Sequence, residues 1–150
     1  MRDARLLAEP FVPAELIDKF AKAHPQSGGV CHFVGEVRGG QGIEGLELSC
    51  YRPLTLPGIE HLAHAAHNRF DLLGILIAHR VGVLQVGEPI VCVSAAAPHR
   101  REAIDAVDYC MDHLKCASWF WKREQRADGW HWIEPRSDDH AAIARWNDGK

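Results

Sequence analysis

The residues best suited to chemistry lie between His99 and Glu124. His99 and Arg100 suit an anion, because guanidinium makes bidentate contacts with phosphate or carboxylate and imidazole can donate or titrate. Lys115 and Lys122 follow, and two amines near other cations disfavour their own charging, which lowers a pKa. A lysine of lowered pKa can act as a base or nucleophile near neutral pH. We therefore interpret this stretch as the active-site segment.

An amphipathic helix must position these groups. Apolar residues recur at steps of three and four, at Ala103, Ile104, Val107, Cys110, Met111 and Leu114. Acidic residues in the first turn favour the positive end of the helix dipole, and the free amides there suit an anion. The apolar period contains no Gly or Pro, so Arg100 and Lys115 should lie about 22 Å apart along one helix. They cannot both contact one small substrate from the same subunit.

Ordinary surface roles would also account for these cations. Lys115 could extend to solvent and pair with Asp112. The basic and aromatic run that follows Lys115 would also suit an edge strand with its charges facing solvent. Bases concentrated in an otherwise acidic protein favour an anionic ligand instead.

Several short motifs follow one another along the chain. They are Phe33-Val34-Gly35-Glu36-Val37-Arg38, His79-Arg80-Val81-Gly82, Gly87-Glu88, His99-Arg100, Met111, Lys115, Phe120-Trp121-Lys122-Arg123-Glu124 and Ala144-Arg145-Trp146. In this order and spacing they resemble the large, catalytic subunit of molybdopterin synthase, and the similarity extends from about residue 4 to residue 146. The resemblance implies an α/β hammerhead fold and a homodimer of this subunit.

That family transfers sulfur from a small ubiquitin-like carrier to cyclic pyranopterin monophosphate, which forms the dithiolene of molybdopterin. The carrier ends in Gly-Gly with a C-terminal thiocarboxylate, and its tail enters the large subunit. The resemblance therefore implies a sulfurtransferase of molybdenum cofactor biosynthesis. It also implies a heterotetramer with two carriers and no cofactor besides the pterin substrate.

Matching motif positions implies a role for each site residue. Lys115 and Lys122 would be the catalytic pair, with Lys115 at the thiocarboxylate. The implied substrate-binding residues are Glu36, Val37, Arg38, His99, Arg100, Lys115, Lys122, Arg123, Glu124 and Arg136, and the implied channel residues are Phe33, Met111 and Trp121. Because the His-Arg pair and Lys115 lie at opposite helix ends, we expect each site to combine residues of two subunits.

The sequence departs from the family pattern in a few places. The loop after Arg38 is shorter than usual, Ser49 and Val83 stand where an acid is common, and Trp119 replaces a frequent proline. These changes could alter substrate entry or carrier docking. A module that only binds a ubiquitin-like carrier would not need Lys115, and a phosphate-binding enzyme of another family would need the cations alone.

Composition limits the remaining possibilities. The 150 residues, 47% of them hydrophobic, suit one domain, and the formal charge of -3 disfavours nucleic acid as a partner. No apolar run is long enough for a signal peptide or a membrane span, so we expect a cytoplasmic protein. Five cysteines without a CxxC pair argue against a disulfide framework or a structural zinc site. His61, His64 and His67 diverge around a helix, which disfavours a shared metal.

The order of predicted elements favours an α+β fold with a mixed or antiparallel sheet. We predict a helix from Pro13 to about Ala23, a strand over 30–37 and a helix from Pro57 or Gly58 to Phe70. Two β-rich runs follow at 74–84 and 89–96. A hairpin with its turn at Asp128-Gly129 and a short final helix over 138–146 should close the chain.

Overall fold

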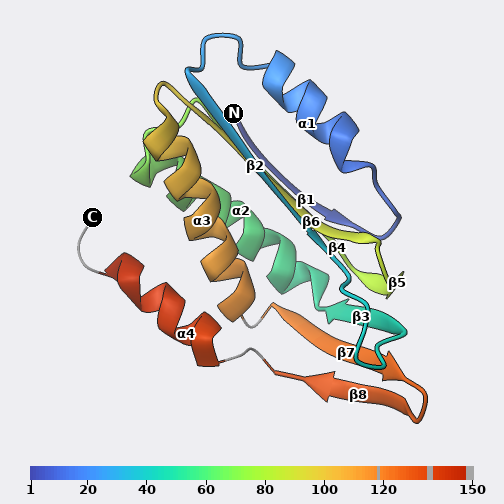
Figure 1. Cartoon of the computed structure of the whole chain (residues 1–150). Coiled ribbons are helices and arrows are strands. Elements are labelled where there is room, and N and C mark those ends of the chain that lie inside the picture. The colour runs from blue at the N-terminus through green and yellow to red at the C-terminus, as the bar shows by residue number, and fades with distance from the viewer. Residues whose placement is uncertain (118, 135–136, 148–150) are drawn as a thin grey trace.

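The strands form two four-stranded sheets, one of which lies beyond the end of the other (Figure 1). The computed structural model describes residues 1–117, 119–134 and 137–147, apart from the side chains of residues 137 and 138. Its elements are β1 (Arg2–Leu7), α1 (Pro13–Lys22), β2 (Gly29–Glu36), β3 (Gly45–Cys50), α2 (Arg52–Arg69), β4 (Gly74–Arg80), β5 (Gly82–Gln85), β6 (Pro89–Ala97), α3 (Arg100–Cys116), β7 (Phe120–Arg126), β8 (Gly129–Ile133), α4 (Ser137–Ala144) and a 3₁₀ turn (Arg145–Asn147). The fold is α+β, as predicted.

The first sheet has the strand order β1-β4-β6-β2, with β1 parallel to β4 and the other pairs antiparallel. Helix α1 covers one face, and α2 and α3 cover the other (Figure 1). Strand β4 is buried at all its positions, which explains its nearly continuous apolar sequence. Ile75 and Ile77 of this strand share the main core with Ile59 of α2 and Val107 of α3. Burying an aliphatic side chain of this size contributes roughly 1.5–3 kcal/mol.

The second sheet has the order β5-β3-β7-β8 and is antiparallel throughout. The chain passes from the first sheet to the second at Val81 and Gly82, where Gly82 has a φ of 103° that favours glycine. The predicted β-rich run over 74–84 is therefore two strands in different sheets. The apolar pattern did not reveal the break, because it continues through Val83 and Leu84.

Helix α2 begins at Arg52, and the predicted start at Pro57 or Gly58 was wrong. Pro53 lies in the first turn, where its missing N–H costs no intrahelical bond. The hydroxyl of Thr55, which is fully buried, donates a hydrogen bond to the Trp119 carbonyl over 2.8 Å. This contact with a distant segment stabilises the earlier start, and local sequence could not reveal it.

Helix α3 is continuous from Arg100 to Cys116, as predicted. The hairpin between β7 and β8 also forms, but Arg126 pairs with Gly129, so its two turn residues are Ala127 and Asp128. Helix α4 and the 3₁₀ turn are the last described elements and lie beside α3 (Figure 1). Together they span nearly the same residues as the predicted final helix over 138–146. No helix within the described ranges is long and apolar enough to cross a membrane.

Candidate active site

A cleft of about 590 Å³ lies where the two sheets meet the C-terminal end of α3. Strand β2 and the residues after it, the end of β4, the last turns of α3 and the inner face of β7 all contribute to its wall. Apolar side chains of both sheets, including Leu46, Leu48, Ile90 and Ile133, form part of the lining. Both predicted catalytic lysines, Lys115 and Lys122, lie in this cleft.

Strand β7 places Lys122 on the inner face of the second sheet. Successive strand residues alternate between faces, so Phe120, Lys122 and Glu124 face the cleft. The strand lies between β3 and β8, so the alternative of a basic edge strand is wrong. The basic residue at position 122 is instead held inside the fold.

The pKa of Lys122 is lowered from its ordinary value. Burial is the largest cause, because it disfavours the charged form, and the nearby charge of Lys115 is the second. Asp139 and Glu124 act in the opposite direction. The sequence predicted this lowering from the proximity of two amines, and the structure adds burial as the larger cause.

Lys115 lies in the last turn of α3, at the exposed side of the cleft. The alternative in which it pairs with Asp112 is not observed among the described contacts. The Asp112 carboxylate instead accepts hydrogen bonds from the Arg145 guanidinium at 2.7 Å and 3.1 Å and from the Trp146 indole at 2.7 Å. Lys115 is therefore directed to the cleft without an acidic partner on its own helix.

Most of the residues predicted around these lysines also line the cleft. They are Phe33, Glu36, Val37, Arg38, Met111 and Glu124. Val37 is held from both sides, because its N–H donates to the Glu88 carbonyl and its own carbonyl accepts from Gly87. Arg38 follows directly and is exposed, so its guanidinium can reach a ligand in the cleft.

Two predicted residues of β7 lie on the opposite face of the second sheet. Trp121 is 50% exposed there, and Arg123 makes an ion pair with Glu47 over 2.6 Å. The Arg123 guanidinium also lies over Trp130 and Trp132, at 4.9 Å and 5.2 Å from their ring centres. Neither residue lines the cleft of its own chain, because strand alternation turns both away from Lys122.

The predicted anion pair lies at the other end of α3. His99 occupies the N-cap position and Arg100 the first turn, and both side chains are exposed. The start of β2 packs closely beneath them, since a Cβ at Gly29 would lie 2.9 Å from the Arg100 Cα. The structure therefore does not bring His99 and Arg100 to the lysines of the same chain. Arg136, another predicted anion contact, lies outside the described residues.

The cleft contains three polar residues that were not predicted as site residues: His79, Glu134 and Asp139. The signal for His79 was the His79-Arg80 pair, which the resemblance implies is part of the family's structural signature, and the role of this pair was left open. Glu134 and Asp139 follow the last strand and belong to no motif that spacing could identify. Only the tertiary fold brings them beside residues from α3 and β7.

The cleft of one chain is not strongly cationic. Its described lining includes the cations Arg38, Lys115 and Lys122 and the acids Glu36, Glu124, Glu134 and Asp139. Arg126 compensates part of this negative charge, since it lies 2.8 Å from the Glu124 carboxylate. An anionic substrate would need further cations.

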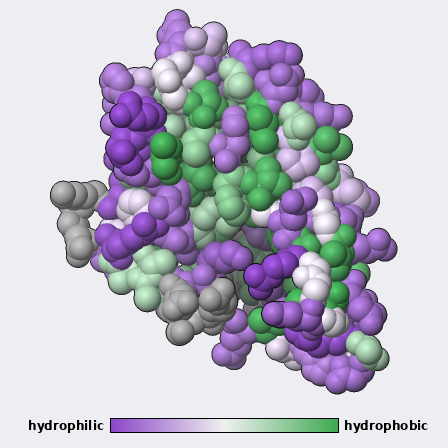
Figure 2. Space-filling view, in the orientation of Figure 1, coloured by the Kyte–Doolittle hydropathy of each residue, from purple (hydrophilic) through white to green (hydrophobic). Residues whose placement is uncertain are grey.

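The surface around β2 and α3 is apolar (Figure 2). Strand β2 is at one edge of the first sheet and pairs only with β6. Val30 and Phe33 of β2 and Ile104 of α3 are 36%, 42% and 44% exposed. Ile104 was predicted as part of the buried stripe of α3, but it lies at its border and faces outward. This surface reaches the cleft at Phe33.

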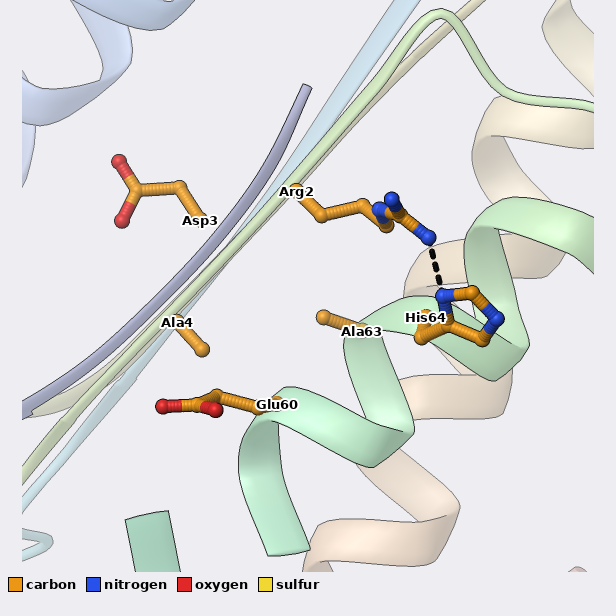
Figure 3. Close-up of a pocket in the computed structure, with 6 residues that line it drawn as sticks. All are labelled: Arg2, Asp3, Ala4, Glu60, Ala63 and His64. Carbon is orange, nitrogen blue, oxygen red and sulfur yellow. Dashed lines mark hydrogen bonds between the residues drawn. The ribbon is translucent and has the colours of Figure 1, made fainter. Parts of the chain in front are cut away.

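A second concavity lies between β1 and α2 (Figure 3). Arg2, Asp3, Glu60 and His64 line it, and Arg2 donates a hydrogen bond to His64. Asn68 contacts the other ring nitrogen of His64 at 3.0 Å. This concavity shares no lining residue with the lysine cleft.

Fold and cleft together define an α+β enzyme subunit with paired amines at the junction of two sheets. The chain belongs to the MoaE protein family, whose family model matches residues 6–117. It is 43% identical over 143 residues to the molybdopterin synthase catalytic subunit of Caulobacter vibrioides, covering 95% of each chain. The counterpart from Pseudomonas aeruginosa is 37% identical over 147 residues, covering 96% of this chain and 98% of that protein.

Solved structures agree with this assignment. The molybdopterin biosynthesis MoaE protein from Burkholderia ambifaria matches with a TM-score of 0.83 at 34% identity, covering 98% of this chain and 99% of that one. The match includes both sheets and the helices that border the cleft, because it covers nearly the whole chain. The family resemblance seen in the sequence is therefore confirmed.

Proposed function

We propose that this chain is the catalytic subunit of a sulfurtransferase that forms the dithiolene of molybdopterin. The sulfur donor is the C-terminal thiocarboxylate of a small ubiquitin-like carrier, and the acceptor is cyclic pyranopterin monophosphate. The observation that carries this proposal is the meeting of Lys115 and Lys122, from separate elements, in one cleft. The names of the relatives as catalytic subunits of molybdopterin synthase support the same reaction.

The two lysines differ in their surroundings, which suits different roles. Lys122 is largely buried and its pKa is lowered, so it more readily provides the neutral amine needed for proton abstraction. Lys115 is exposed at the cleft, where its ammonium can stabilise negative charge on the arriving thiocarboxylate. Apolar residues such as Phe33 and Met111 would guide an extended glycine tail between them.

Phosphate binding requires more positive charge than one chain supplies. Arg38 is suited to bind the substrate phosphate, but the acids of the cleft offset the cations there. We propose that His99 and Arg100 of a second subunit complete the site. Their exposure and their distance from Lys115 along a continuous α3, about 22 Å, fit this role.

A two-fold dimer through the β2 edge would create this arrangement. A two-fold axis near the middle of β2 makes the two copies of the strand antiparallel, so the start of one lies beside the end of the other. The start of β2 packs against the His99-Arg100 end of α3, and its end leads into Glu36 and Arg38 at the cleft. The apolar surface over β2 and α3 in Figure 2 would be buried in such a dimer.

The carrier would bind each cleft from outside this dimer, giving a heterotetramer with two carriers. We place the reaction in the cytoplasm, an expectation supported by five cysteines that are all free. The pterin is the substrate, and the proposal includes no resident cofactor.

The proposal is tested by mixing the purified subunit with a thiocarboxylated carrier and cyclic pyranopterin monophosphate. We expect dithiolene product from the wild type and a loss of at least roughly 100-fold in Lys115→Ala and Lys122→Ala. Lys22→Ala is the control, because Lys22 is 76% exposed and pairs only with Asp18 on α1. Full activity of both cleft variants would contradict the enzyme and favour a module that only binds the carrier.

A further inference from the structure

His79 is the one buried residue of the cleft whose chemistry remains unused in the proposed reaction. It lies near the end of β4 and is only 7% exposed, yet it lines the same cleft as both lysines. A buried histidine at this position costs desolvation that a leucine would avoid. Its position therefore needs an explanation beyond packing.

The ring of His79 has one nitrogen engaged and one available. Nδ1 lies 2.8 Å from the Arg80 carbonyl, which can only accept, so Nδ1 carries the proton and Nε2 carries the lone pair. Nε2 has no hydrogen-bond partner among the described residues. Because His79 lines the cleft, Nε2 is the ring nitrogen left for a contact there.

The ring is also fixed beside Lys122. It stacks on Phe120, with ring centres 4.0 Å apart and planes within 18°. Phe120 and Lys122 are two residues apart on the same face of β7, a separation of about 7 Å along a strand. The pKa of His79 is lowered to about 4, mainly by burial, and the nearby charges of Lys122 and then Lys115 lower it further. The imidazole is therefore neutral at physiological pH.

We propose that His79 is a positioning residue for Lys122: its Nε2 accepts a hydrogen bond from a water molecule that in turn binds the Lys122 side chain. This inference rests on the proposed function of the cleft. A neutral acceptor orients the amine without adding a third positive charge to the lysine pair. An acceptor also stabilises the ammonium form, so it limits how far burial lowers the pKa of Lys122.

Other ionisable groups also line the cleft. They are Glu36 and Arg38 at the end of β2, Lys115 on α3, Glu124 on β7, Glu134 after β8 and Asp139 on α4. Of these, Lys115, Asp139 and Glu124 influence the pKa of Lys122. Variants at His79 leave all of them in place, so a change in the titration of Lys122 reports the imidazole itself.

Two substitutions at His79 test the roles of the two ring nitrogens separately. His79→Asn retains a donor near the position of Nδ1 and removes the acceptor, whereas His79→Gln places an amide oxygen near the position of Nε2. The pKa of Lys122 is measured by NMR in protein with ¹³C-labelled lysine, assigned with Lys122→Arg. We expect His79→Asn to lower that pKa and to reduce kcat roughly tenfold, with KM for the carrier within about twofold. His79→Gln should return both values toward the wild type.

His24→Asn is the matched control. His24 is half-buried, whereas His79 is buried, but the two share their ring contacts: Nδ1 of His24 also lies 2.8 Å from a carbonyl, that of Phe20, and its ring also packs on an aromatic ring. It lies at the end of α1 and does not line the cleft, so its replacement should leave the titration of Lys122 unchanged.

The inference is overturned if Lys122 titrates alike in the wild type and in His79→Asn, or if His79→Gln is no closer to the wild type than His79→Asn. Should His79→Asn fail to fold, Phe120→Leu removes the ring that holds the imidazole, and an unchanged pKa of Lys122 there also overturns the inference. The titration needs no substrate. A wild type that forms no dithiolene would refute the proposed function and leave this test intact.

Discussion

At the scale of single residues, the cleft contains buried ionisable groups whose burial costs stability. Lys122 is held with its pKa lowered mainly by burial, and His79 is held neutral. Both therefore link folding to pH, because the folded and unfolded chains bind protons differently. These links can be measured without any substrate.

Replacing Lys122 by methionine should stabilise the chain. The unfolded chain binds the lysine proton more tightly than the folded chain, so the cost is fully present below the folded pKa and disappears above the ordinary value of 10.5. We expect the free energy of unfolding of Lys122→Met to exceed that of the wild type by about 1 kcal/mol at pH 7. Urea unfolding should show a smaller difference near pH 10.5. Lys22→Met is the control, and an equal gain at both pH values would contradict this explanation.

His79 should weaken the fold in acid. Its pKa falls from 6.5 to about 4 on folding, so the unfolded chain binds an extra proton between these values. Stability is therefore intact above pH 6.5 and declines as the pH falls, by about 3 kcal/mol from this residue at pH 4. Urea unfolding at several pH values between 7 and 4 should show that the free energy of unfolding falls less steeply with decreasing pH in His79→Asn than in the wild type. If the free energy of unfolding falls equally with pH in the two proteins, another group causes the loss of stability in acid.

At the scale of elements, the sequence was most informative where one periodicity extends over a whole element. The uninterrupted pattern of α3 predicted a continuous helix, and this separation of Arg100 from Lys115 led to the shared-site hypothesis. The alternation along β7 also separates Lys122 from Trp121 and Arg123, but family motifs had grouped all three. Residues that match a motif together need not face the same side of a strand.

The 3₁₀ turn that follows α4 is anchored to α3 by the side chain of Asp112, which could not be predicted from local sequence. Arg145 and Trp146 bind the same Asp112 oxygen, and Arg145 also pairs with Asp108 at 2.6 Å. Asp112→Asn should weaken the charge-assisted contacts and increase amide exchange in α4 roughly tenfold. Mass spectrometry of exchanged peptides would measure this increase. Asp108→Asn is the control and should have a smaller effect, since the Trp146 contact remains; equal effects would contradict the role of Asp112.

At the scale of the whole molecule, composition and element order predicted an α+β chain but not its division into two sheets. The crossing at Gly82 is hidden in a continuous apolar run, and the early start of α2 depends on a contact between Thr55 and the distant Trp119. The cleft forms at the junction that these long-range contacts create. This is why Glu134 and Asp139 were found only in the folded chain, and why a motif named His79 without placing it in the cleft, whereas the lysines were assigned to the site by motif.

The central claim is that two lysines of one subunit act on a substrate bound by His99 and Arg100 of the other. Arg100→Ala and Lys115→Ala subunits can be produced together with different affinity tags, so that only mixed dimers are purified. Each mixed dimer would contain one intact site, and dithiolene formation should recover to about half of the wild-type rate while each parent dimer stays inactive. If the mixed dimers are no more active than the parents, the site does not combine residues of two subunits and the account is wrong.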